Sequence, residues 1–162
     1  MSLSASLLLS HELSGIRVSG ALPEATLRRL DLLFSGDGTL DRALELLDGS
    51  LTRVAAAPSG RVAWTVASSL SKRPSAELAP LDLRASGVDP VGYYYTVLLD
   101  GPGSCTCVDW TTRVLCGDRR ACKHALAVAI ADALGPQKYR ARTVTDEELA
   151  KMLRNSFQTL QR

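Results

Sequence analysis

Four residues of this chain have the types and the spacing of a metal site. Cys105 and Cys107 lie two positions apart, and Cys122 and His124 repeat that spacing after a gap of fourteen residues. Thiolate and imidazole are donors that Zn²⁺ prefers, and the ion usually takes four of them in a tetrahedron. Side chains two apart on an extended segment point to the same face, so Cys105 and Cys107 can reach one ion. The pattern predicts one bound Zn²⁺ per chain.

The second pair of ligands stands directly before a predicted helix. Residues 125–134 are almost all alanine, leucine, valine and isoleucine, and the run stops at Gly135-Pro136. We therefore expect Cys122 at the start of the helix and His124 in its first turn. There the positive end of the helix dipole favours the negative charge of a zinc ion held by three thiolates.

We expect this zinc to be structural. A catalytic zinc keeps one position open for water, whereas four protein donors fill the coordination sphere. No glutamate lies between residues 105 and 124 to act as a base, so the sequence favours a protein that is not an enzyme. Cys116 is a fifth possible donor, but its neighbours, residues 117–120, indicate an exposed loop, and we expect it to stay outside the site. The alternative to a zinc site is that all four cysteines are reduced and bind no metal.

The residues that flank the four predicted ligands indicate which zinc-finger family the motif resembles. Residues 105–110 read Cys-Thr-Cys-Val-Asp-Trp, and residues 121–128 read Ala-Cys-Lys-His-Ala-Leu-Ala-Val. Both stretches resemble the halves of the SWIM zinc finger. Residues 33–44 and 50–69 are similar to the small SWIM-domain subunit of the Shu homologous-recombination complex. The resemblance covers residues 27–73 and 92–153; it departs at Val108, where proline is common, and at an insertion over residues 74–90.

The resemblance implies a role without catalysis. It predicts an adaptor in homologous-recombination DNA repair, located in the nucleus, which pairs with a RecA-type recombinase paralogue and supports recombinase filaments on single-stranded DNA. The chain has no P-loop motif, so any ATPase must be the partner. A SWIM finger also permits a stand-alone nucleic-acid-binding protein or a ubiquitin-ligase-associated protein.

Basic residues are concentrated around the motif. Residues 105–142 contain seven basic and three acidic side chains, although the whole chain has a net charge of only +2. Contact with phosphates is one interpretation, and a solvated loop is the other. The tentative nucleic-acid contacts are Arg113, Arg119, Arg120, Lys123, Lys138, Arg140 and Arg142.

Composition and periodicity predict an α+β protein of one globular unit. The hydrophobic share of 46% and the charged share of 22% are ordinary for a globular domain. No apolar run is long enough to span a membrane, and the start lacks the pattern of a signal peptide, so we expect a reducing compartment and no membrane partner.

The predicted elements form four consecutive segments. Residues 1–50 are a helical segment, with helices over 4–13, 23–34 and 39–47, which either cover the sheet or form a partner surface. Residues 51–100 contain a β-hairpin (51–57 and 61–68), a loop insert over 70–90 and a strand over 93–99, giving a small antiparallel three-stranded sheet that we expect the first half of the finger to join. Residues 101–135 are the finger. Residues 136–162 are a basic connector and a last helix, opened by a capping box at Thr145 and Glu148.

Overall fold

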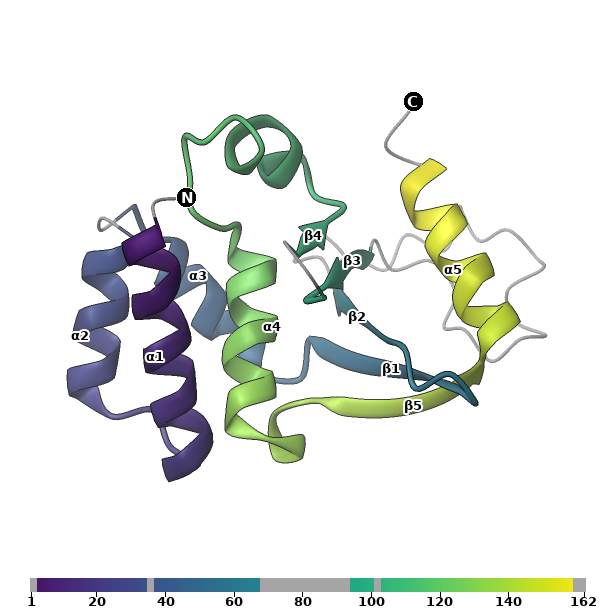
Figure 1. Ribbon diagram of the computed structural model, residues 1–162, viewed down its shortest axis with the longest axis horizontal. Helices are drawn as coiled ribbons and strands as arrows, with labels where there is room; N and C mark the ends of the chain where they lie inside the picture. The colour runs from purple at the N-terminus through teal and green to yellow at the C-terminus, as the bar shows by residue number, and fades with distance from the viewer. Residues whose placement is uncertain (1–2, 35–36, 68–93, 101–102, 159–162) are drawn as a thin grey trace.

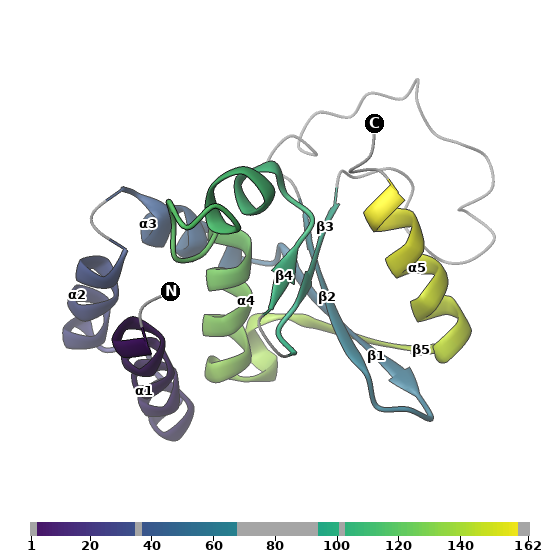
Figure 2. The same cartoon turned by 45° about the horizontal axis from the view of Figure 1, so that its top comes forward.

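The architecture is a mixed β-sheet with helices against both of its faces (Figures 1 and 2). The computed structural model describes residues 3–34, 37–67, 94–100 and 103–158, and the predicted insert over 70–90 lies outside them. The α+β class is confirmed. Among the described residues, no helix combines the length and the apolar character needed to cross a membrane.

Three helices and a short 3₁₀ turn make up the first part of the chain. They are α1 (Leu3–Ser19), α2 (Glu24–Leu33), α3 (Thr39–Leu44) and η1 (Glu45–Leu47). The second and third follow the predicted helices, and Pro23 precedes α2 in an extended conformation. The first helix runs six residues past its predicted end at residue 13. It continues through Gly15 because the next residue, Ile16, is fully buried in the core.

The sheet is larger than predicted. Its strands are β1 (Leu51–Ala57), β2 (Val62–Ala67), β3 (Tyr94–Leu98), β4 (Ser104–Cys105) and β5 (Arg140–Thr145), in the spatial order β4-β3-β2-β1-β5. The hairpin of β1 and β2 is confirmed, and β3 and β4 extend it in antiparallel fashion.

The predicted number of three strands is wrong, because two further segments join the sheet. The first half of the metal motif pairs with β3, as expected, with Cys105 opposite Val97. The predicted basic connector forms β5, which pairs in parallel with β1 from Thr52 and Arg140 to Ala57 and Thr145. Residues 143–145 are Thr-Val-Thr, β-branched residues that suit a strand.

Helices cover the sheet unequally. On one face, α4 (Lys123–Leu134) packs on the strands, and α1 and α3 pack against α4. The core on this side is large and includes Trp64, Leu126 and all three buried cysteines. On the other face, α5 (Asp146–Gln158) covers a smaller cluster around Val54 and Leu149. Two further short elements belong to the described part of the chain: the π-helical turn η4 (Trp110–Val114) and the 3₁₀ turn η5 (Pro136–Lys138).

Candidate metal centre

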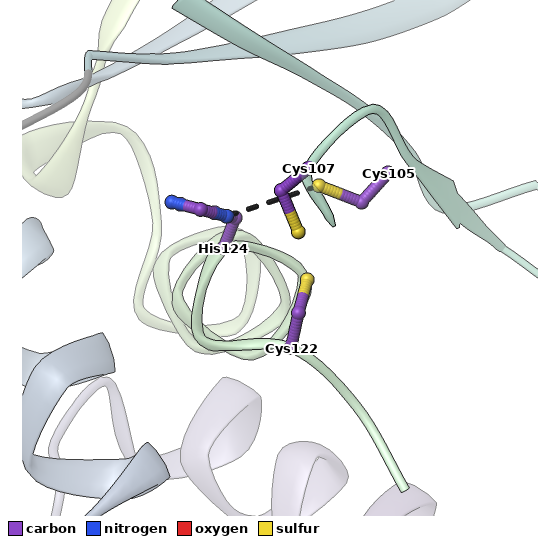
Figure 3. A group of neighbouring side chains, drawn as sticks. All are labelled: Cys105, Cys107, Cys122 and His124. Carbon is purple, nitrogen blue, oxygen red and sulfur yellow. Dashed lines mark hydrogen bonds between the residues drawn. The ribbon is translucent and has the colours of Figure 1, made fainter. Parts of the chain in front are cut away.

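The structure brings the four predicted ligands together. The ligand atoms of Cys105, Cys107, Cys122 and His124 all lie within 4.8 Å of one another, and all four side chains are buried. Figure 3 shows them converging from the end of β4 and from the start of α4. The Sγ atom of Cys105 lies 3.9 Å from Nδ1 of His124. The donors of a tetrahedral zinc site stand about 3.5–3.8 Å apart, so the cluster could hold a single metal ion after a small contraction.

The strand half of the centre is fixed by backbone pairing. Thr106, between the two cysteines, donates its amide to the Thr96 carbonyl at 3.0 Å. The Thr106 hydroxyl in turn accepts the Thr96 amide at 2.9 Å. This double contact keeps the segment extended just beyond β4, so Cys105 and Cys107 face the same point, as the spacing predicts. The amide of Trp110 then donates to the Cys107 sulfur at 3.3 Å.

The helix half of the centre is the first turn of α4. Cys122 is the N-cap residue, and its sulfur accepts the Ala125 amide at 3.4 Å. His124 follows within the first turn, so the predicted placement of both ligands is confirmed. A helix start supplies free N–H groups and a positive dipole end, and both favour thiolates.

Tyr95 is a supporting residue that the sequence did not single out. Its ring stacks on the His124 imidazole, with centroids 4.2 Å apart and planes 29° apart. Tyr95 and Val97 lie on the face of β3 that packs toward α4, which is the face that carries Cys105. The stacked ring limits rotation of the imidazole and keeps Nδ1 directed at the sulfur atoms. The alternation of side chains along β3 indicates on which face of the sheet Tyr95 lies, but it does not indicate that His124 is its neighbour.

The three thiols strongly influence one another's ionisation. Hydrogen bonds from Cys105 and Cys122 lower the pKa of Cys107, and hydrogen bonding to Cys107 and Cys122 together with burial raises the pKa of Cys105. Three negative sulfurs so close together repel one another, so full ionisation of the cluster is unfavourable without a cation. A divalent cation between them removes that repulsion, so the donor set suits a thiophilic metal such as Zn²⁺.

Two other candidate donors lie apart from the cluster. Cys116 is exposed, in the loop that follows η4, and is not among the converging ligands. His11 is exposed on α1. The exposure of Cys116 agrees with the sequence interpretation.

The loop between the two halves is fastened to the N-terminal helices. Arg119 lies 3.3 Å from carboxylate oxygens of both Asp37 and Asp109, and only 19% of its side chain is exposed. The guanidinium of Arg120 donates to the Leu33 carbonyl at the end of α2, at 2.6 Å. These contacts connect the loop between the two ligand pairs with α2 and with the segment before α3.

The seven basic residues proposed as nucleic-acid contacts occupy two places. Arg113, Arg119, Arg120 and Lys123 lie in the loop and at the start of α4, whereas residues 138–142 follow the other end of that helix. The twelve residues of α4 separate the groups by about 18 Å along the helix axis. In the loop group, Arg119 and Arg120 are engaged within the chain. Contact of either group with nucleic acid stays a prediction.

Comparisons of the chain with protein-family models, with curated proteins and with solved structures find no match. The donor geometry is therefore the firmest guide to function.

Proposed function

We propose that the chain is a non-catalytic adaptor whose fold is stabilised by one structural Zn²⁺. The observation that supports this best is the burial of the whole donor set: Cys105, Cys107, Cys122 and His124 are each 4% exposed or less. Three thiolates and one imidazole complete a tetrahedral sphere, so no position is left for water or substrate. Two hollows beside α2 are lined by other residues, with no ligand in either wall.

The chain's own residues would hold the ion in a fixed orientation. Bound there, Zn²⁺ would offset most of the charge of the thiolates and join β4 to α4. The amides of Trp110 and Ala125 donate to two of the sulfurs, and Tyr95 limits the rotation of the imidazole. Because binding free energies of about 10–16 kcal/mol are typical of such sites, metal binding and folding should be strongly coupled.

The SWIM resemblance supports a partner class for this adaptor. It favours a RecA-type recombinase paralogue, and action on recombinase filaments on single-stranded DNA during repair in the nucleus. A protein of this kind needs no catalytic machinery of its own, in agreement with the lack of a P-loop in the chain. A stand-alone nucleic-acid-binding finger is the main competing proposal, supported by the basic side chains in the loop and on β5.

Metal analysis tests the zinc centre. The chain, purified under reducing conditions without chelator, should contain one zinc ion, measured by plasma mass spectrometry. Cys122→Ser should lose most of the zinc and unfold at a much lower denaturant concentration, because the helix half of the site loses its thiolate. Cys116→Ser is the matched control and should keep both zinc and stability. Full zinc retention by Cys122→Ser would refute the assignment.

Reconstitution tests the adaptor proposal. Co-expression with each RecA-type paralogue of the source organism should give a stoichiometric complex with one of them, detected by size-exclusion chromatography. The lone chain should bind a single-stranded oligonucleotide weakly, even at low salt. Tight binding by the lone chain, lost on charge reversal at Lys123 or Arg140, would instead favour the stand-alone finger.

A further inference from the structure

Strand β5 forms one border of the sheet and is long enough to pair with a further strand. It comes last in the spatial order of the strands, and all six of its residues pair in parallel with β1. Figure 1 shows β5 along the lower border of the sheet, with β1 on its inner side. In a parallel pair, alternate residues direct their amide and carbonyl groups away from the partner strand. Within the described part of the chain, residues 140–144 make no backbone hydrogen bond beyond this pairing, so their outward groups are open.

The two borders of the sheet differ in length. At the opposite border, β4 has only two residues and is too short to hold a further strand. By contrast, β5 contains no proline and pairs with β1 without a bulge. Proteins usually protect a long border strand by such devices, by a covering element or by charge. Among the described residues the protection of β5 is its charge, so its side chains select which strand can be added.

The side chains of β5 make this border positive. Residues 138–145 include three basic side chains, Lys138, Arg140 and Arg142, and no acidic one. Arg140, Arg142 and Val144 alternate along the strand and therefore share a face, which is the α5 face because Val144 packs in the smaller cluster under that helix. Arg140 is exposed, and its guanidinium has no hydrogen bond or ion pair with any described residue. The border thus combines open backbone groups with at least one uncompensated cation.

We infer that the outer border of β5 is a docking site for an extended, acidic segment of a partner protein, which adds one more strand to the sheet. The backbone of this segment would bond to the outward amides and carbonyls of β5. Acidic residues at every second position would lie on the face that carries Arg140 and pair with it, because opposite residues of neighbouring strands share a face. This docking site does not depend on the proposed function.

Other occupants fit the border less well. A second copy of the chain would bring the arginines of both β5 strands onto one face of the joined sheet, where like charges on neighbouring strands repel each other. A nucleic acid would pair with Arg140 and with the outward amides. Its phosphate oxygens only accept hydrogen bonds, however, so they offer nothing to the outward carbonyls. An extended acidic peptide supplies donors, acceptors and negative charge together.

Peptide titrations followed by NMR test the inference. The isotope-labelled full chain is loaded with zinc and carries Cys116→Ser, so that the exposed thiol cannot form disulfides. The probes are capped peptides of about eight residues in which glutamate alternates with valine, threonine or tyrosine. At least one peptide should shift the amide signals of β5 and slow hydrogen exchange at alternate residues of that strand. The same peptide with lysine in place of glutamate should bind about tenfold more weakly or worse.

Two controls separate backbone pairing from charge. A glutamate peptide with N-methyl groups on its central residues keeps its charge but cannot donate to β5, so it should not bind. Arg140→Glu should weaken the glutamate peptide about tenfold or more and strengthen the lysine peptide, because the border charge is reversed. Lys151→Glu makes the same change in net charge at an exposed position on α5, so it should bind both peptides like the parent. Circular dichroism and zinc content check that both variants are folded.

Four results would each overturn the inference. No peptide binds at millimolar concentration, or the N-methylated peptide binds as well as its parent. A single-stranded oligonucleotide binds more tightly than any peptide and shifts the same β5 signals, which would assign the border to nucleic acid. The β5 signals change with protein concentration while the mass doubles, which would assign the border to a second copy.

Discussion

The two faces of the sheet are held to their helices in different ways. On the α4 face, the core contains large side chains such as Trp64, Leu51 and Leu126, and the four candidate ligands meet between the end of β4 and the start of α4. On the α5 face, Ala56 and Ala63 supply much of the buried strand surface, and Leu149 is the one large buried side chain that α5 contributes among its described residues. The first face combines extensive burial with a site that could cross-link strand and helix through one ion, whereas the second face depends on a few contacts.

The helix starts show the same contrast. Cys122 caps α4 with a sulfur atom that is also a candidate metal ligand, so the cap and the metal centre are a single structure. Thr145 caps α5 through a capping box, in which its hydroxyl accepts the Glu148 amide and Glu148 accepts the Thr145 amide. The α5 face should therefore open at a lower free energy than the α4 face, which is the general behaviour of thinly packed elements.

The sharpest test compares one large side chain from each face. Trp64 is 2% exposed, and its ring makes an edge-on contact with the ring of Tyr139, with the ring centroids 4.8 Å apart. Trp64→Ala should lower the free energy of unfolding by about 3–5 kcal/mol, because it leaves a large cavity in the α4 face. Leu149→Ala should lower the free energy of unfolding by only about 2–3 kcal/mol, because α5 can separate from the sheet and the rest of the fold then stays intact. Urea denaturation at saturating zinc measures both values, and a larger cost at Leu149 would reverse the comparison.

A smaller effect is expected from the cap of α5. Thr145→Ala removes the hydroxyl that accepts the Glu148 amide and should cost about 1 kcal/mol. Hydrogen exchange should accelerate in the amides of α5 and stay unchanged in α4. Thr143→Ala, at an exposed position on the same strand, is the control and should leave α5 protected. Faster exchange in both helices would show that the two faces open together.

The smallest expected effect is a dependence of α5 docking on pH. The hydrogen bond from the Thr145 amide lowers the pKa of Glu148, so the folded chain favours the ionised carboxylate. The stabilisation is complete above the ordinary pKa of glutamate and is lost as the pH falls through the lowered value. Exchange in α5 should accelerate over that acidic range, and Glu148→Gln should make the response flatter. An equal response in both proteins would assign the effect to another carboxylate.

Much of the metal centre can be predicted from the sequence, because its evidence is local. The spacing within each pair of ligands is visible in the sequence, and the alanine-rich run after His124 indicates the helix that carries the second pair. The hairpin and the capping box are equally local, since the residues that define them lie within a few positions of one another.

Local patterns do not predict contacts between distant parts of the chain. Residues 140–145 join β1, which lies more than eighty positions upstream, and no local pattern indicates a parallel partner. The density of basic residues suggested one patch, but α4 carries Arg140 and Arg142 to the opposite end from the loop. Arg119 is held by Asp37, and a charge in a predicted loop gives no sign of such a partner.

The pairing of β1 with β5 has a consequence for biosynthesis. Translation delivers His124 before any residue of β5, so a nascent chain that binds the proposed metal would do so while β1 is still the edge strand of the sheet. Strand β5 would then dock onto a scaffold that the ion has already joined. We therefore expect metal shortage during synthesis to leave β1 without its final neighbour, as a site where newly made copies aggregate.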